Sequence, residues 1–345
     1  MKTVTFLFLI SFAHLVFGGE TSRLSEVLIH SRSLEGNLLG DPAKRHVAVY
    51  LPPSYYVDHE RRYPVVYVLH GNRRPASKAP RNILGIFGEP TLDLMDALIA
   101  EGRVKEMIVV QPDGRHRYGG CQYANSSVSG NWADFVVKDL VTYIDDNFRT
   151  LPKPESRGLI GSSMGGRGVL DLALKFPGVY GTVYAMFPGQ MGFQRFDRDN
   201  DAEAWRKLIL AEDPNTSERG LPRLLGFAVA FSPNPDSPPY FADFPMRVNG
   251  KTMEFNKEVQ QQWAKFDPVE IAAKSADSLL ELKALYFDCG TSDQGLEAVR
   301  LFSSILKKQN IPHEYDEYDG GHGDPGAVRF RSRVLPSVSV HLAVK

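Results

Sequence analysis

The chain has 345 residues, of which 43% are apolar and 23% charged, and its formal net charge is −1 at pH 7. This balance excludes a disordered or fibrous chain, and it provides no basic field that would hold a nucleic acid or an anionic membrane by charge alone. The two cysteines exclude a disulfide scaffold. No Cys/His cluster has the spacing of zinc ligands, so we expect neither a metal nor a cofactor.

The first segment of the chain has the pattern of a secretion signal. Lys2 precedes a short apolar run over residues 4–10, and the apolar stretch then ends in small residues at Gly18. We therefore predict a signal peptide over residues 1–18 and a secreted or periplasmic mature protein that begins at Gly19. The alternative is a buried N-terminal strand. No other window approaches the 18 apolar residues of a membrane span, so the mature chain is expected to have none.

Apolar runs rich in β-branched residues alternate with helical patterns along the rest of the chain. Continuous apolar runs are typical of strands buried on both faces, and apolar residues at three-and-four spacing are typical of amphipathic helices. The predicted strands cover residues 47–51, 64–71, 107–110, 157–163, 183–187 and 282–287, and the predicted helices cover 132–144, 164–176 and 296–308. This alternation predicts the α/β class, with a doubly wound, mostly parallel sheet and helices on both faces.

Residues 191–266 interrupt this alternation. They hold seven of the 23 prolines and an acidic segment over residues 197–201. We predict that they are an insertion in a single domain that spans residues 19–345. Ligands of such folds bind at the carboxyl edge of the sheet, so we expect the insertion to cap that edge. The alternative is a peripheral excursion with no role in the site.

A G-x-S-x-G motif, made by Gly161, Ser163 and Gly165, lies between a predicted strand and a predicted helix. A nucleophilic serine in this context sits on a turn so tight that the residues two before and two after it must be nearly free of side chain. The helix that follows aims the backbone amide of Met164 at the position of a tetrahedral oxyanion. We therefore predict Ser163, and not Ser162, as a nucleophile. The alternative is a glycine-rich β–α turn without a catalytic role.

A serine hydroxyl is a poor nucleophile unless a base takes its proton and an acid orients that base. In this type of fold the chain order is Ser, acid, His. Of the histidines that follow Ser163, His322 lies in a glycine-rich loop after the strand-like segment 313–318, and it is the predicted base. Asp288 and Asp293 are the candidate acids near the end of the preceding strand. We predict Asp293, which lies beyond a turn glycine, and expect Asp288 to bond backbone amides.

The second oxyanion donor is predicted to be the backbone amide of Asn72. This residue lies in the loop after the strand that ends at His70 and Gly71, which is where such folds place their second donor. His70 precedes the nucleophile along the chain, so we interpret it as a residue that holds this loop and not as the base.

Cys121 and Cys289 both follow strand-like runs. In an oxidising compartment they would be able to form a disulfide. Two buried free thiols are the alternative, and the sequence leaves both open.

Five segments together carry a resemblance to a known family. They are VYLPPSY at 49–55, YPVVYVLHG at 63–71, GSSMGG at 161–166, GTSD at 290–293 and GGH at 320–322. In this order they resemble the esterase family that includes esterase D, the enterochelin esterases, the mycolyltransferase antigens and the acetylxylan and feruloyl esterases of carbohydrate esterase family 1. The resemblance covers about residues 25–190 and 267–343, and it implies an α/β-hydrolase fold. It also implies a triad of Ser163, Asp293 and His322, with oxyanion amides at Met164 and at the residue after Gly71.

These observations predict a secreted serine carboxylic-ester hydrolase that acts through an acyl-enzyme. Its expected substrates are carbohydrate-linked or small aryl or acetyl esters, either free or attached to a polysaccharide. An acyltransferase or a serine peptidase would use the same triad, and a hydrolase-fold binding protein without turnover is a further alternative. The insertion matches no substrate-defining pattern of the family. The enzymatic alternatives are separated by whether water or an alcohol accepts the acyl group.

Overall fold

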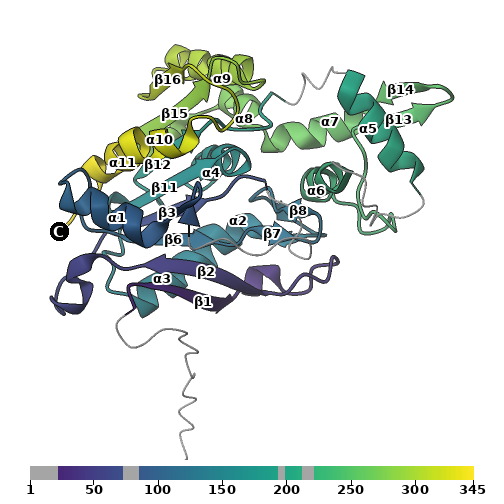
Figure 1. Ribbon diagram of the computed structural model, residues 1–345. Coiled ribbons are helices and arrows are strands. Elements are labelled where there is room, and N and C mark those ends of the chain that lie inside the picture. Colours follow the sequence, from purple (N-terminus) through teal and green to yellow (C-terminus); the bar gives the residue numbers. More distant parts are fainter. Residues whose placement is uncertain (1–21, 73–84, 193–198, 212–220) are drawn as a thin grey trace, which may run out of the picture.

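A computed structural model describes residues 22–72, 85–192, 199–211 and 221–345 of the protein. The predicted signal peptide, residues 1–18, lies outside the described residues. A central sheet carries helices on both faces, and a group of helices with a small hairpin extends from one side of it (Figure 1).

The central sheet has eight strands in the order β1-β2-β6-β3-β11-β12-β15-β16 among the described residues. These strands are β1 (Leu24–His30), β2 (Lys44–Tyr50), β3 (Val65–Leu69), β6 (Ile108–Pro112), β11 (Arg157–Ser162), β12 (Thr182–Met186), β15 (Ala284–Gly290) and β16 (Glu314–Tyr318). β2 pairs antiparallel with both of its neighbours, and every pair from β6 to β16 is parallel. The predicted mostly parallel sheet is thus confirmed, and the carboxyl ends of its six parallel strands meet at one edge.

Two hydrophobic cores lie on opposite faces of this sheet. Along β3, Val65, Tyr67 and Leu69 belong to one core, while Val66 and Val68 belong to the other. Successive side chains of a strand point to opposite faces, so a continuous apolar run fills both cores at once. This is the physical reason why β3 has no charged residue and is apolar along its whole length.

The helices cover both faces. They are α1 (Thr91–Ala100), α2 (Trp132–Asp134), α3 (Val141–Asn147), α4 (Met164–Lys175), α5 (Asp199–Leu210), α6 (Leu221–Phe231), α7 (Lys257–Trp263), α8 (Pro268–Lys274), α9 (Leu296–Lys308), α10 (Gly326–Arg329) and α11 (Leu335–His341). One core receives side chains of α2, α3, α4, α8 and α9, and the other receives those of α1 and α11. α9 has the predicted bounds. The helix predicted over 132–144 consists of α2 and α3 joined by a π-helical turn over Phe135–Leu140.

Four short hairpins accompany the sheet in the described ranges. They are β4 (Gly85–Ile86) with β5 (Glu89–Pro90), β7 (Arg115–His116) with β8 (Gly119–Gly120), β9 (Asn125–Ser126) with β10 (Gly130–Asn131), and β13 (Met246–Asn249) with β14 (Thr252–Phe255). The β7–β8 hairpin follows β6 directly, so it lies at the carboxyl edge of the sheet.

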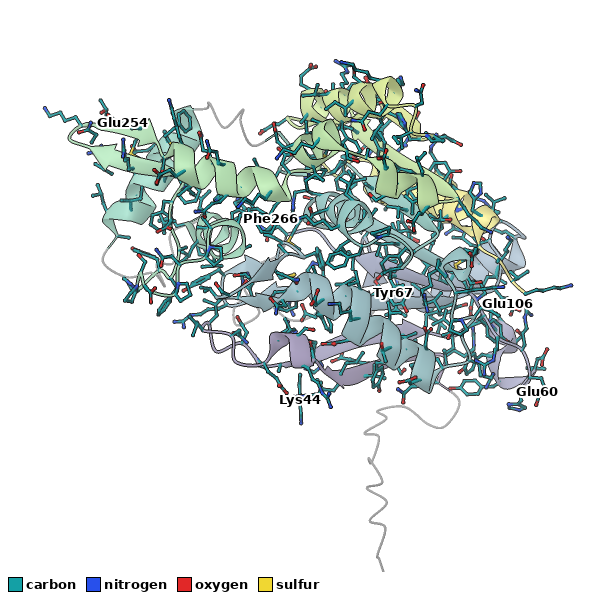
Figure 2. The ribbon with its side chains drawn as sticks, turned by 180° about the vertical axis from the view of Figure 1, so that it is seen from behind. Lys44, Glu60, Tyr67, Glu106, Glu254 and Phe266 are labelled. Carbon is teal, nitrogen blue, oxygen red and sulfur yellow. The ribbon has the colours of Figure 1, made fainter. Side chains whose placement is uncertain are left out.

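The described part of the predicted insertion, residues 191–266, packs around a third hydrophobic cluster. α5, α6 and α7 supply most of this third cluster, and Leu39, Tyr118, Ala124 and Val128 join it from the rest of the chain. α6 contacts β8 and β9, so the insertion lies against the hairpins at the carboxyl edge (Figure 1). Glu254 lies on β14, in the part of the insertion that extends away from the main body, whereas Phe266 lies where the insertion rejoins the main body (Figure 2).

A buried arginine connects the insertion to α4. Arg167 is fully buried, and its Nη1 donates a hydrogen bond of 2.9 Å to the carbonyl oxygen of Phe266. Its Nη2 donates to the carbonyl oxygen of Gln122, and its guanidinium lies 4.8 Å from the ring centroid of Phe231. The Arg167 guanidinium therefore joins α4 to the end of α6, at Phe231, and to the last residue of the insertion, Phe266.

Candidate active site

Ser163 lies on a sharp turn between β11 and α4. Its backbone angles are φ 54° and ψ −114°, a conformation that non-glycine residues rarely adopt. A Cβ atom added to Gly161 would collide with the backbone of Gly165, and one added to Gly165 would overlap the carbonyl oxygen of Leu69 and lie 2.9 Å from that of His70. The two glycines are required by space, as the motif predicts, and the turn holds a strained serine at the edge of the sheet.

The structure brings Ser163, His322 and Asp293 together from three separate elements. The Oγ of Ser163 lies 2.8 Å from Nε2 of His322, and Nδ1 of His322 lies 2.7 Å from Oδ2 of Asp293. His322 follows β16, and Asp293 follows β15. The side chain of His322 is 46% exposed and that of Asp293 is 4% exposed. The serine and histidine are therefore accessible to a ligand, while the carboxylate behind them is shielded from water.

The Asp293 carboxylate is held in its charged form. Burial raises the pKa of Asp293. Hydrogen bonds from His322 and from the Gly295 amide lower this pKa by more than burial raises it, so the pKa lies below its ordinary value. The Gly295 N–H donates to Oδ1 at 2.7 Å while His322 occupies Oδ2. Each oxygen has its own donor, which fixes the rotation of the carboxylate. An ionised carboxylate at Nδ1 favours the tautomer in which Nε2 is an acceptor for the serine hydroxyl.

The two residues predicted to supply oxyanion donors both lie close to Ser163. Met164 is the first residue of α4, where a backbone N–H has no partner within the helix. Asn72 follows Gly71, and a Cβ atom on Gly71 would lie 3.1 Å from Cβ of Ser163. The Asn72 loop therefore runs directly beside the serine. The Oδ1 of Asn72 accepts a 2.9 Å hydrogen bond from the Gly120 amide.

The side chains that the sequence set aside as catalytic candidates have other partners. Nε2 of His70 accepts a 2.9 Å hydrogen bond from the Gly114 amide, as expected of a residue that holds the loop. Asp288 is fully buried and accepts from Tyr184, Arg329 and the Phe187 amide at 2.8–3.1 Å. His313 and His341 bond to Ser303 and Tyr286, respectively.

Two residues that the sequence analysis did not single out complete the surroundings of the serine. The Gly189 amide donates to the carbonyl oxygen of Ser163 at 2.9 Å, and a Cβ on Gly189 would lie 3.2 Å from the serine Oγ. The ring of Phe187 meets that of His322 edge to face, with centroids 5.3 Å apart. Phe187 and Gly189 lie just after β12, a central parallel strand, and this position in the sequence would have indicated that they are near the site.

Cys121 and Cys289 are free and buried. Burial raises the pKa of Cys121 to about 12, and it also raises the pKa of Cys289. Of the two alternatives that the sequence left open, the structure has the pair of buried thiols. Within the described ranges, no group of three or more His, Cys, Asp or Glu side chains is placed to hold a metal ion.

Across the same residues, no helix combines the length and the apolar character needed to cross a bilayer.

A serine on a strained strand-to-helix turn, above the carboxyl edge of a mostly parallel sheet, defines the α/β-hydrolase class. The family model described as "Putative esterase" matches residues 42–335, and the chain belongs to this esterase family. It is 30% identical over 279 residues to Esterase Rv1288 of Mycobacterium tuberculosis, a match that covers 80% of this chain and 52% of that protein. The chain thus spans about half the length of the curated relative.

Solved structures share the fold. A ferulic acid esterase superposes with a TM-score of 0.61 at 20% identity, covering 92% of this chain and 98% of that one. An S-formylglutathione hydrolase from Agrobacterium tumefaciens superposes with a TM-score of 0.59 at 18% identity, covering 95% of this chain and 99% of the other. The predicted family and fold are both confirmed.

Proposed function

We propose that the protein is a serine carboxylic-ester hydrolase in which Ser163 is the nucleophile, His322 the base and Asp293 the orienting acid. One observation carries this proposal, namely the unbroken hydrogen-bond chain from Ser163 Oγ through both ring nitrogens of His322 to Asp293, at 2.8 and 2.7 Å. Such a chain allows the hydroxyl to lose its proton as it attacks, because the imidazolium that forms lies against a carboxylate.

In the first step, the Ser163 oxygen attacks the ester carbonyl and its proton passes to Nε2 of His322. The carbonyl oxygen becomes an oxyanion and accepts hydrogen bonds from the backbone amides of Met164 and Asn72. Each such donor lowers the barrier by about 3 kcal/mol in hydrolases of this kind. His322 then gives its proton to the leaving alcohol, which leaves an acyl group on Ser163.

In the second step, water attacks the acyl-enzyme while His322 takes its proton, and His322 then returns a proton to the Ser163 oxygen as the carboxylic acid leaves. The His322 side chain is nearly half exposed, and this supports the role because water is able to reach the imidazole ring. An alcohol that bound in the same place would produce acyl transfer instead of hydrolysis. The ratio of hydrolysis to acyl transfer depends on whether water or an alcohol binds beside the acyl-enzyme, and an assay must determine this ratio.

We infer that the substrates are carbohydrate-linked or small aryl or acetyl esters. The family match and the structural similarity to a ferulic acid esterase support this class. The packing of α6 against the β8 hairpin strand at the carboxyl edge supports a capping role for the insertion, residues 191–266. The N-terminal pattern supports a secreted or periplasmic protein, which would be tested by sequencing the N-terminus of the exported chain.

The proposal is tested by turnover of p-nitrophenyl acetate together with a panel of acetylated and feruloylated xylans. Wild-type protein is expected to release p-nitrophenol, and Ser163→Ala to release none above background. Ser162→Ala is the matched control, because it removes a neighbouring hydroxyl that has no place in the proposed chemistry. Equal turnover by Ser163→Ala and wild type would refute the assignment. Addition of methanol and detection of methyl acetate separates transfer from hydrolysis.

A further inference from the structure

The β7–β8 hairpin makes a direct hydrogen bond to the proposed oxyanion loop. This hairpin comprises Arg115–His116 and Gly119–Gly120, and it leaves the carboxyl end of β6 (Figure 1). The Gly120 amide donates to Oδ1 of Asn72 at 2.9 Å. The Asn72 side chain is thereby anchored to a neighbouring element, and this contact fixes the residue whose backbone amide is the second proposed donor.

Gly120 also touches the second proposed donor residue. A Cβ atom added to Gly120 would overlap the Sδ of Met164, and it would lie 2.9 Å from the Met164 Cε and 2.6 Å from Oδ1 of Asn72. The backbone φ of Gly120 is not in the left-handed region. Glycine is therefore required here by space and not by conformation. The side chains of Asn72 and Met164 thus both approach Gly120, which has no side chain of its own.

Buried hydrogen bonds hold the hairpin that carries Gly120 in place. Arg115 is 2% exposed and forms two hydrogen bonds of 2.9 Å to the Asp113 carboxylate. His116 is fully buried, and its Nδ1 accepts a 3.0 Å hydrogen bond from the Tyr118 amide. Arg45 donates to the carbonyl oxygens of Asp113 and Arg115. These contacts support the hairpin, because the Asp113 carboxylate and the carbonyl oxygens of Asp113 and Arg115 each accept a hydrogen bond from a buried guanidinium.

The insertion lies against the other side of the same hairpin. A Cβ on Gly226 of α6 would lie 3.5 Å from His116 Cε1, 3.6 Å from the Tyr118 carbonyl oxygen and 3.7 Å from the Gly120 carbonyl oxygen. These are ordinary contact distances, so α6 packs closely on the hairpin without crowding it. The hairpin is thus enclosed between the insertion and the two donor residues.

We propose that Gly120 is a positioning residue for the oxyanion hole. The Gly120 amide holds the Asn72 side chain, and the absence of a Cβ atom at Gly120 leaves room for the side chain of Met164. The backbone amides of Asn72 and Met164 are thereby directed at one point beside Ser163. Stabilisation of an oxyanion depends on donors held within a few tenths of an ångström of the position where charge develops. This inference rests on the proposed function, because it assigns Gly120 to the same reaction.

The first test is Gly120→Ala, assayed with p-nitrophenyl acetate. We expect kcat to fall by about 100-fold, the effect of losing one oxyanion donor, while KM changes by less than about threefold. Binding of a trifluoromethyl ketone, which forms a tetrahedral oxyanion on the serine, should weaken by the same factor as kcat/KM. If the role of Gly120 were only structural, the substitution would lower the melting temperature, and the loss of ketone affinity would not match the loss of kcat/KM. Gly226→Ala is the matched control and should keep wild-type kinetics, because its methyl group fits.

A second variant, Asn72→Ala, keeps the backbone amide and removes only the Oδ1 that Gly120 holds. We expect a fall in kcat of about 10-fold or more and the same parallel with ketone binding. If Gly120→Ala does not fold, Asn72→Ala decides the question. Wild-type kinetics in Asn72→Ala, or in a folded Gly120→Ala, would overturn this inference and leave the proposed function intact. A wild-type protein that turns over no ester would overturn both.

Discussion

Replacing Asp293 with asparagine changes the chemistry of the proposed site at one atom. The Oδ1 that accepts from the Gly295 amide is retained, while Oδ2 becomes an NH₂ group. That group donates to Nδ1 of His322 instead of accepting from it, so the ring proton moves to Nε2. Nε2 is 2.8 Å from the Ser163 hydroxyl, and in this tautomer it is a donor and no longer a base.

The expected effect is large because the geometry is preserved while the protonation is wrong. The equivalent change in a serine protease triad lowers kcat by about 10⁴, which corresponds to about 5.5 kcal/mol of transition-state stabilisation. We expect kcat of Asp293→Asn for p-nitrophenyl acetate to fall by the same order. Folding should change little, since the side chains have the same size and the Gly295 hydrogen bond remains.

The matched control is Asp288→Asn, which alters the other carboxylate near the end of β15. Asp288 bonds to Tyr184, Arg329 and the Phe187 amide and not to His322, so we expect kcat within about fivefold of wild type. Its charge faces the Arg329 guanidinium at 2.8 Å in a fully buried position, so the free energy of unfolding should fall by about 3 kcal/mol. The reasoning is refuted if Asp293→Asn retains more than about a tenth of wild-type kcat, or if Asp288→Asn shows the larger loss of activity.

Three further predictions concern groups outside the triad. Arg167→Met should lower the free energy of unfolding in urea by about 3–5 kcal/mol, because the buried carbonyl oxygen of Gln122 and the partly buried one of Phe266 lose their donor; a loss below about 1 kcal/mol would contradict this. Cys121 and Cys289 should react with a thiol reagent only after denaturation, in a protein never exposed to reductant, and readily modified native protein or absent thiols would contradict the buried, free state. Hydrogen bonds from Arg115 hold the pKa of Asp113 below its ordinary value in spite of burial, so this carboxylate stabilises the fold at neutral pH. The stability difference between wild type and Asp113→Asn should therefore persist down to about pH 4 and shrink as the pH falls further through the lowered native pKa, and a difference that grows in acid would be inconsistent.

The parts of the site that the sequence predicted are those whose constraints are local or follow chain order. Gly161 and Gly165 mark the turn because no side chain fits there, and this constraint acts within five residues. His322 and Asp293 were predicted because parallel strands bring their carboxyl ends to one edge, so loops far apart in sequence meet there. Asp288 was separated from Asp293 by its place within the strand and not beyond it, and the structure has it bonded to a backbone amide as expected.

The features that the sequence did not reveal depend on contacts between elements. Gly120 looks like an ordinary turn glycine until the side chains of Met164 and Asn72 are seen to converge on it. β1 is an edge strand with mostly half-exposed side chains, so it lacks the apolar run that identifies the central strands. Arg167 lies on a helix whose buried face would be expected to be apolar, and its role follows only from the carbonyl oxygens that the insertion brings to it.

The central claim is that Ser163 forms the covalent acyl-enzyme, and mass spectrometry after labelling with a fluorophosphonate tests it most directly. The account predicts one adduct per chain, on the peptide that contains Ser163, with loss of ester turnover in proportion to labelling. Labelling should disappear in Ser163→Ala and become far slower in His322→Ala. An adduct on a different residue, or ester turnover that persists in fully labelled protein, would contradict the account.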